Sequence, residues 1–191
     1  MTSYKAVVIG TSAGGLTALT RVLSPLPGDF PLPIIIVQHL SPDSDDFLIR
    51  HLKRSCDLNV KEAEDKDVPR PGWIYVAPPN YHLMVEEERY LSLSVGPPVN
   101  FSRPSIDVLF ETAADAYTRG LVGIILTGAN SDGTRGSQKI RMLKGQVIVQ
   151  DPETAEADMM PRSVIEKKAA DKVLPLDEIG KYLRNLIKDI L

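Results

Sequence analysis

Residues 5–23 constrain the fold more than any other stretch of the chain. An apolar run over residues 6–9 predicts a buried strand, and Gly10, Gly14 and Gly15 predict a sharp turn after it. Leucines then recur at three- and four-residue spacing, which predicts a helix with one apolar face. A strand that passes through a tight turn into a helix is the first unit of an α/β sheet.

Strand-like and helix-like segments alternate along most of the chain, which predicts a doubly wound, mostly parallel sheet with helices on both faces. Further strands are expected at residues 34–37, 121–126, 146–150 and 172–174, and further helices at 41–54, 105–118, 134–143, 160–168 and 175–190. Between residues 59 and 95, short strand-like runs broken by proline and glycine predict strand excursions and an antiparallel hairpin at one edge of the sheet.

Length and composition exclude several classes of protein. With 191 residues, 43% hydrophobic and 25% charged, the chain is expected to form a single domain over residues 1–191. The sequence has no long apolar run and its first residues lack a basic region followed by an apolar one, so neither a membrane span nor a signal peptide is expected, and the lone Cys56 favours a cytoplasmic protein. A net charge of −3 without a basic cluster argues against nucleic acid as a partner. The three histidines show no metal-binding spacing, so neither a metal nor another cofactor is expected.

Ser12 lies in the predicted turn, within the sequence Gly10-Thr11-Ser12-Ala13-Gly14. This sequence satisfies G-x-S-x-G, the nucleophile-elbow pattern, in the strand-to-helix context that the pattern requires. Glycine-rich turns are also common after the first strand of any α/β sheet, where they cradle phosphates. A dinucleotide site would need G-x-G-x-x-G and an acidic residue at the end of the second strand, and this chain has neither.

Ser12, His39 and Asp132 each follow a predicted parallel strand, so the topology is expected to bring them to one edge of the sheet. A serine, an imidazole and a carboxylate in contact form a triad for acyl transfer, whatever their order in the chain. Each residue also has a plain structural alternative: Ser12 as a turn residue, His39 as packing at a strand end, and Asp132 as a helix cap.

Six segments in this order resemble the catalytic domain of the CheB family of chemotaxis protein-glutamate methylesterases: VVIGTSAGG, VQHLSPDSDDF, IYVAPPNYHL, RPSIDVLFETAA, GIILTGANSDGTRG and QDPETAEADMMPRSVI. The resemblance implies that Ser12 is the nucleophile, His39 the general base and Asp132 the residue that orients it. It implies hydrolysis of glutamate γ-methyl esters on a chemoreceptor-like helical protein and deamidation of glutamine side chains, with no cofactor.

The resemblance also has departures. The family commonly has Gly-Met-Gly-x-Asp-Gly where this chain has GANSDG at residues 128–133. By the resemblance, backbone amides near Ala13 and Ala129 bind the oxyanion, Arg103 lines the cleft and Met160 lies near it. The structural alternatives are helix capping with a solvated Arg103 and loop packing of Met160. The first predicted strand begins about four residues into the sequence, so the receiver domain of the chemotaxis enzyme is not expected here; the sequence is either a free-standing esterase or a fragment of a longer chain. The alternative function is a catalytically idle signalling scaffold that docks a partner at the same cleft.

Overall fold

A seven-stranded parallel sheet forms the centre of the computed structural model, which describes residues 4–39 and 46–188. The strand order is β3-β4-β2-β1-β7-β8-β9. The strands are β1 (Ala6–Thr11), β2 (Ile34–Gln38), β3 (Asn59–Glu62), β4 (Trp73–Val76), β7 (Leu121–Ile125), β8 (Gln146–Gln150) and β9 (Lys172–Leu174). All neighbouring strands pair in parallel, which confirms the predicted fold class.

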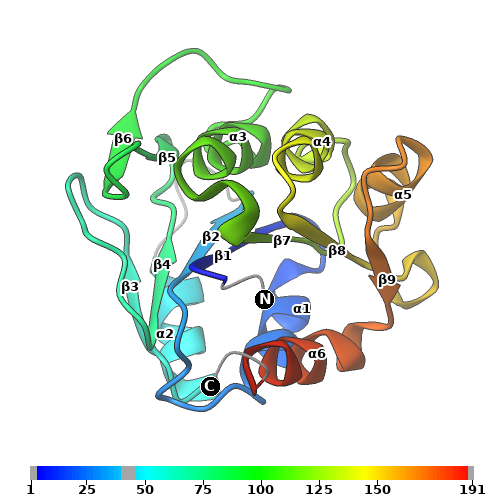
Figure 1. The fold of residues 1–191 in the computed structure, drawn as a ribbon, viewed down its shortest axis with the longest axis horizontal. Coiled ribbons are helices and arrows are strands. Elements are labelled where there is room, and N and C mark those ends of the chain that lie inside the picture. Colours follow the sequence, from blue (N-terminus) through cyan, green and yellow to red (C-terminus); the bar gives the residue numbers. More distant parts are fainter. Residues whose placement is uncertain (1–3, 40–45, 189–191) are drawn as a thin grey trace.

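Helices cover both faces of the sheet (Figure 1). One face carries α1 (Gly15–Leu23), α2 (Phe47–Ser55) and α6 (Leu176–Lys188), and the other carries α3 (Ile106–Tyr117), α4 (Thr134–Met142) and α5 (Met159–Glu166). Two 3-10 turns, η1 (Thr118–Gly120) and η2 (Pro152–Thr154), complete the helical elements. The expected start of α2 at residues 41–44 lies outside the described residues.

Side chains on the central strands alternate between two separate hydrophobic cores. In β1, Val7 and Ile9 pack into the core beneath α1 and α6, whereas Ala6 and Val8 pack into the core beneath α3. All four are fully buried. Continuous runs of branched apolar residues therefore form these strands because both faces of the sheet are covered.

The region between residues 59 and 95 differs in part from the expectation. β3 and β4 are not excursions: β4 inserts between β2 and β3 and pairs in parallel with both. The segment between β3 and β4 contains prolines and a glycine, a composition typical of turns. It instead forms the crossover connection between these two parallel strands. The predicted antiparallel hairpin is present as β5 (His82–Val85) and β6 (Leu91–Ser94), a separate two-stranded sheet whose β5 strand packs against α3.

The chain leaves β1 on one side to form β2 and returns to its other side to form β7, so the loops after β1 and β7 diverge at a topological switch point. Buried polar side chains at the carboxyl ends of the strands hold these loops in place. Thr11 Oγ1 donates to Thr127 O at 2.8 Å, and Gln150 Oε1 accepts from Thr127 N at 2.8 Å. The switch point is therefore a fixed platform for side chains in the loops that follow.

Among the described residues, no helix combines the length and the apolar character needed to cross a bilayer.

Candidate active site

Asp132 lies fully buried in the loop between β7 and α4, and its carboxylate accepts six hydrogen bonds. Oδ1 accepts from Asn100 Nδ2 (3.0 Å), Ser105 Oγ (2.9 Å), Asp107 N (3.0 Å) and Gly133 N (3.0 Å), and Oδ2 accepts from His39 Nε2 (2.8 Å) and Ile106 N (2.6 Å). Two of these donors are free amides of the first turn of α3. Asp132 therefore caps α3 from a distant loop, rather than α4, which follows it in sequence.

This environment keeps Asp132 ionised. Burial raises the pKa of the Asp132 carboxyl, but hydrogen bonds from His39, Asn100 and the amides of Ile106 and Asp107 outweigh burial and lower it below its ordinary value. The positive end of the α3 dipole favours the same charge. The neighbouring Asp107 shows the opposite shift, because burial and the nearby Asp132 charge raise its pKa despite hydrogen bonds from Gly136 and Asn100.

His39 directly follows β2, and its backbone N–H donates to Thr11 O at 3.1 Å, which continues the β1–β2 ladder. Its side chain is 12% exposed. Because an ionised carboxylate only accepts hydrogen bonds, the bond to Asp132 places the ring proton on Nε2 and leaves Nδ1 as the acceptor nitrogen. Nδ1 receives a hydrogen bond from Asn130 Nδ2 at 3.3 Å. An imidazole oriented in this way can accept a proton at Nδ1 while Asp132 stabilises the resulting imidazolium.

Ser12 follows β1 in the predicted strand-to-helix turn, in which Gly14 takes the left-handed conformation with φ 78°. The Ser12 backbone is fixed on two sides: its N–H donates to Thr127 O at 2.9 Å, and its carbonyl accepts from Gln38 Nε2 at 2.9 Å. The same Gln38 Nε2 donates to His39 O at 3.0 Å, so one carboxamide joins the backbones of Ser12 and His39. The Ser12 hydroxyl forms no hydrogen bond with another described residue.

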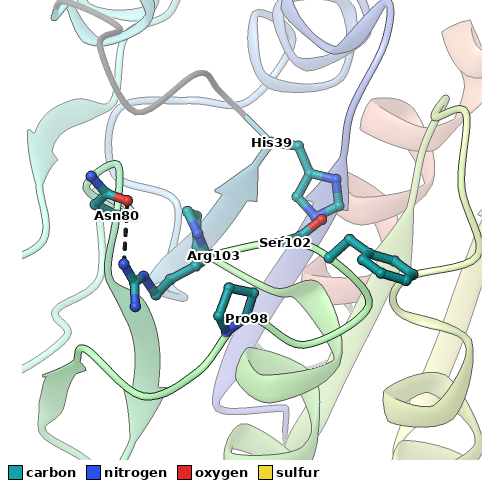
Figure 2. Close-up of a pocket in the computed structure, with 7 residues that line it drawn as sticks. His39, Asn80, Pro98, Ser102 and Arg103 are labelled. Carbon is teal, nitrogen blue, oxygen red and sulfur yellow. Dashed lines mark hydrogen bonds between the residues drawn. The ribbon is translucent and has the colours of Figure 1, made fainter.

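A cavity of about 230 Å³ opens beside His39 (Figure 2). Its lining residues are His39, Asn80, Pro98, Phe101, Ser102, Arg103 and Pro104. Arg103 is held in this wall: Nη1 donates to the carbonyls of Val95 and Gly96, each at 3.0 Å, and Nη2 donates to Asn80 Oδ1 at 3.5 Å. The structure therefore places Arg103 in the same cavity wall as His39.

The other residues predicted for the site take different positions. Ala13 and Ala129 are exposed in the loops after β1 and β7, and the Ala13 carbonyl accepts from Thr127 Oγ1 at 2.8 Å. The Met160 side chain is fully buried and lies against Gly128, beneath the loop that carries Ala129. Met160 therefore supports this loop from below instead of forming an exposed wall of the cleft.

Three residues whose side-chain amides contact the predicted triad were not identified from sequence: Gln38, Asn100 and Asn130. Asn100 sits in a tight turn with φ 50°, and its Nδ2 joins Asp107 Oδ2 at 2.8 Å to Asp132 Oδ1. Neither asparagine belongs to a pattern that indicates its contacts. Gln38 did carry a signal, since a polar residue at the end of an apolar central strand needs a buried partner.

Comparisons with known proteins point to one family. A sequence model described as CheB methylesterase matches residues 7–183. A Leptospira interrogans protein, provisionally named a protein-glutamate methylesterase/protein-glutamine glutaminase, is 52% identical over 184 residues, which cover 96% of this chain and 95% of that protein.

Two longer proteins and one solved structure are also similar. The protein-glutamate methylesterase/protein-glutamine glutaminase of Thermotoga maritima is 39% identical over 97% of this chain, and enzyme 1 of that name from Pseudomonas aeruginosa is 37% identical over 95%. The match spans 55% and 49% of their respective lengths. The crystal structure of the Thermotoga maritima CheB methylesterase catalytic domain superposes with a TM-score of 0.92 at 39% identity, covering 96% of this chain and 99% of that one.

Proposed function

Because this chain belongs to the CheB methylesterase family, a family of carboxylic ester hydrolases, we propose that it hydrolyses glutamate γ-methyl esters on chemoreceptor-like helical proteins. The observation that carries the proposal is the 2.8 Å bond between His39 Nε2 and the buried Asp132 carboxylate, beside the Ser12 turn. The comparisons do not favour an idle docking scaffold. We further propose that residues 1–191 form one catalytic domain and that the protein acts in the cytoplasm.

In the proposed mechanism Ser12 Oγ attacks the ester carbonyl while its proton passes to His39 Nδ1. Asp132 holds the ring and stabilises the imidazolium. Backbone N–H groups at Ala13 and Ala129 bind the oxyanion, an interaction worth about 3–4 kcal/mol per donor in comparable sites. His39 then protonates the departing methoxide, so that the ester C–O bond breaks, methanol leaves and an acyl-serine remains.

Water completes the reaction. His39 removes a proton from the water as its oxygen attacks the acyl carbon, and the proton returns to Ser12 Oγ as the free glutamate leaves. Deamidation of a glutamine side chain follows the same route with ammonia in place of methanol. Arg103, fixed in the cavity wall, contacts the substrate chain next to the reacting side chain in this scheme.

Replacement of the nucleophile tests the proposal. We expect Ser12→Ala to lower methanol release from a methylated receptor fragment by at least about 10³-fold. The fold should be unchanged, because no described residue bonds to the Ser12 hydroxyl. Circular dichroism checks the fold, and Ser163→Ala on α5, whose hydroxyl donates to Met159 O within its own helix, is the matched control. Near-native methanol release by Ser12→Ala would contradict the assignment.

A further inference from the structure

The acceptor nitrogen of His39 already has a partner in this structure. Asn130 Nδ2 donates to His39 Nδ1 at 3.3 Å, and Asn130 Oδ1 accepts from Asp132 N at 3.0 Å. The carboxamide thus joins the imidazole to the backbone of the loop that carries Asp132.

This contact favours one protonation state of the ring. A carboxamide N–H can donate to Nδ1 only while that nitrogen has a free lone pair, which is the neutral imidazole. Protonation of Nδ1 would set two N–H groups against each other, and Oδ1 is already bonded to Asp132 N. The bond to Asn130 therefore stabilises neutral His39 and opposes the imidazolium.

We propose that Asn130 is a positioning residue that competes with the Ser12 hydroxyl for Nδ1 of His39. In the resting enzyme the Asn130 carboxamide donates a hydrogen bond to His39 Nδ1, the atom that must receive the serine proton. Productive substrate binding displaces the carboxamide from this atom. The inference rests on the proposed function in that it takes Ser12 as nucleophile and His39 as base.

The effect of the Asn130 hydrogen bond can be separated from the effects of the charged groups near His39. Asp132 is bonded to Nε2 of His39, and Arg103 lines the same cavity with its guanidinium bonded to the Val95 and Gly96 carbonyls and to Asn80. Asn130 is neutral, so its replacement by alanine changes the donor at Nδ1 without changing the charge of the site.

Two variants separate the donor from the loop contact. Asn130→Ala removes both hydrogen bonds, whereas Asn130→Asp keeps an acceptor for Asp132 N but replaces the donor at Nδ1 with an acceptor. Ser131→Ala is the matched control, because Ser131 is an exposed neighbour in the same loop whose side chain forms no hydrogen bond with the described residues. Both measurements use the full chain: the rate at which a fluorophosphonate labels Ser12, and the 15N NMR chemical shift of His39 Nδ1 at one fixed pH, which reports whether this nitrogen accepts a hydrogen bond.

We expect Asn130→Ala to label about two- to tenfold faster than wild type at pH 7, the range for removal of one competing neutral hydrogen bond. The 15N resonance of His39 Nδ1 should move in the direction that marks loss of an accepted hydrogen bond in Asn130→Ala, and Asn130→Asp, which offers no donor to Nδ1, should fail to restore the wild-type resonance. Ser131→Ala should match wild type in both measurements.

Opposite results would overturn the inference. If Asn130 only supports the loop, Asn130→Ala labels more slowly, Asn130→Asp restores the rate and the Nδ1 resonance stays in place. Equal rates and equal Nδ1 resonances in wild type and Asn130→Ala would also refute the competition. If the wild-type protein itself is not labelled, the proposed function fails, whereas the Nδ1 resonance still decides whether Asn130 donates to His39.

Discussion

At the scale of single residues, Asp132 connects the chemistry of the site to its structure. Its Oδ2 fixes the tautomer of His39, and both of its oxygens accept amides from the first turn of α3. A carboxylate suits both tasks because it only accepts hydrogen bonds, and all six surrounding groups donate. An uncharged replacement of the same shape would satisfy neither task fully.

Asp132→Asn should lower the rate of methanol release by about 10³–10⁴-fold. An amide N–H facing His39 favours the tautomer with the proton on Nδ1, and that nitrogen can then no longer accept the serine proton. Steady-state kinetics on a methylated receptor fragment measure the effect. Asp115→Asn is the control, because Asp115 lies in an exposed ion pair with Lys139 on the outer side of α3 and α4. A loss smaller than tenfold in Asp132→Asn would argue against its orienting role.

The same carboxylate should make stability depend on pH. Although burial raises the pKa of Asp132, its hydrogen bonds lower it below the unfolded value of about 3.9. Its ionised form therefore contributes stability above about pH 4, and this contribution is lost as the pH falls through the lower folded value. The difference in the free energy of unfolding between wild type and Asp132→Asn should shrink as the pH falls below about 4 in urea titrations. A difference that grows as the pH falls below about 4 would contradict the pKa direction.

At the scale of elements, the first residue of α1 packs closely against the last residue of β2. Gly15 begins α1 directly against the Gln38 carboxamide that joins Ser12 to His39. A Cβ atom at Gly15 would lie 1.8 Å from Gln38 Oε1 and 2.9 Å from Thr11 Cγ2. The glycine is therefore needed for the close approach of helix and strand.

Gly15→Ala should displace Gln38 and lower activity by about tenfold or more, because shifts of about 1 Å in catalytic groups cost about this much or more. Fluorophosphonate labelling of Ser12 measures the change in reactivity. Gly120→Ala is the matched control: it precedes β7, and its Cβ would meet only the flexible stem of Lys5 at 3.2 Å or more. Unchanged labelling in Gly15→Ala would show that Gln38 can move without disturbing Ser12 or His39.

Sequence alone was sufficient for most elements because their signals are local. Apolar spacing located β1, α1, β2 and β9, and the topology rule for parallel sheets led to Ser12, His39 and Asp132 as a group. It was not sufficient where a contact depends on tertiary structure. The insertion of β4 between β2 and β3 leaves no trace in the sequence of either strand, and Asn100 reaches Asp132 only because of how its turn packs on α3.

At the scale of the whole molecule, the two hydrophobic cores share the central strands. Phe30 is fully buried in the core beneath α1, and Phe110 on α3 is fully buried in the opposite one. Because β1, β2 and β7 contribute side chains to both, loss of either core removes support from the same strands. The domain should therefore unfold as one unit.

Phe30→Ala and Phe110→Ala should each destabilise the protein by about 3–5 kcal/mol, the usual cost of such a cavity. Urea unfolding monitored by fluorescence of the single Trp73 and by far-UV circular dichroism should give coincident transitions in both variants. The exposed Phe101→Ala is the control and should leave the midpoint of unfolding unchanged. Separate transitions in either core variant would show that the two faces unfold independently.

The position of Asp132 at the head of α3 has a consequence for how sequences of this kind are interpreted. A related protein that has lost hydrolytic activity would still need an acidic side chain at position 132 to cap α3. Retention of this aspartate is therefore a poor marker of catalytic activity. The Ser12 hydroxyl forms no hydrogen bond with another described residue, so it has no structural role that would retain it. Once catalysis is no longer selected for, mutation should replace the aspartate later than this serine. Its presence or absence is therefore the better guide to whether a distant copy still performs chemistry.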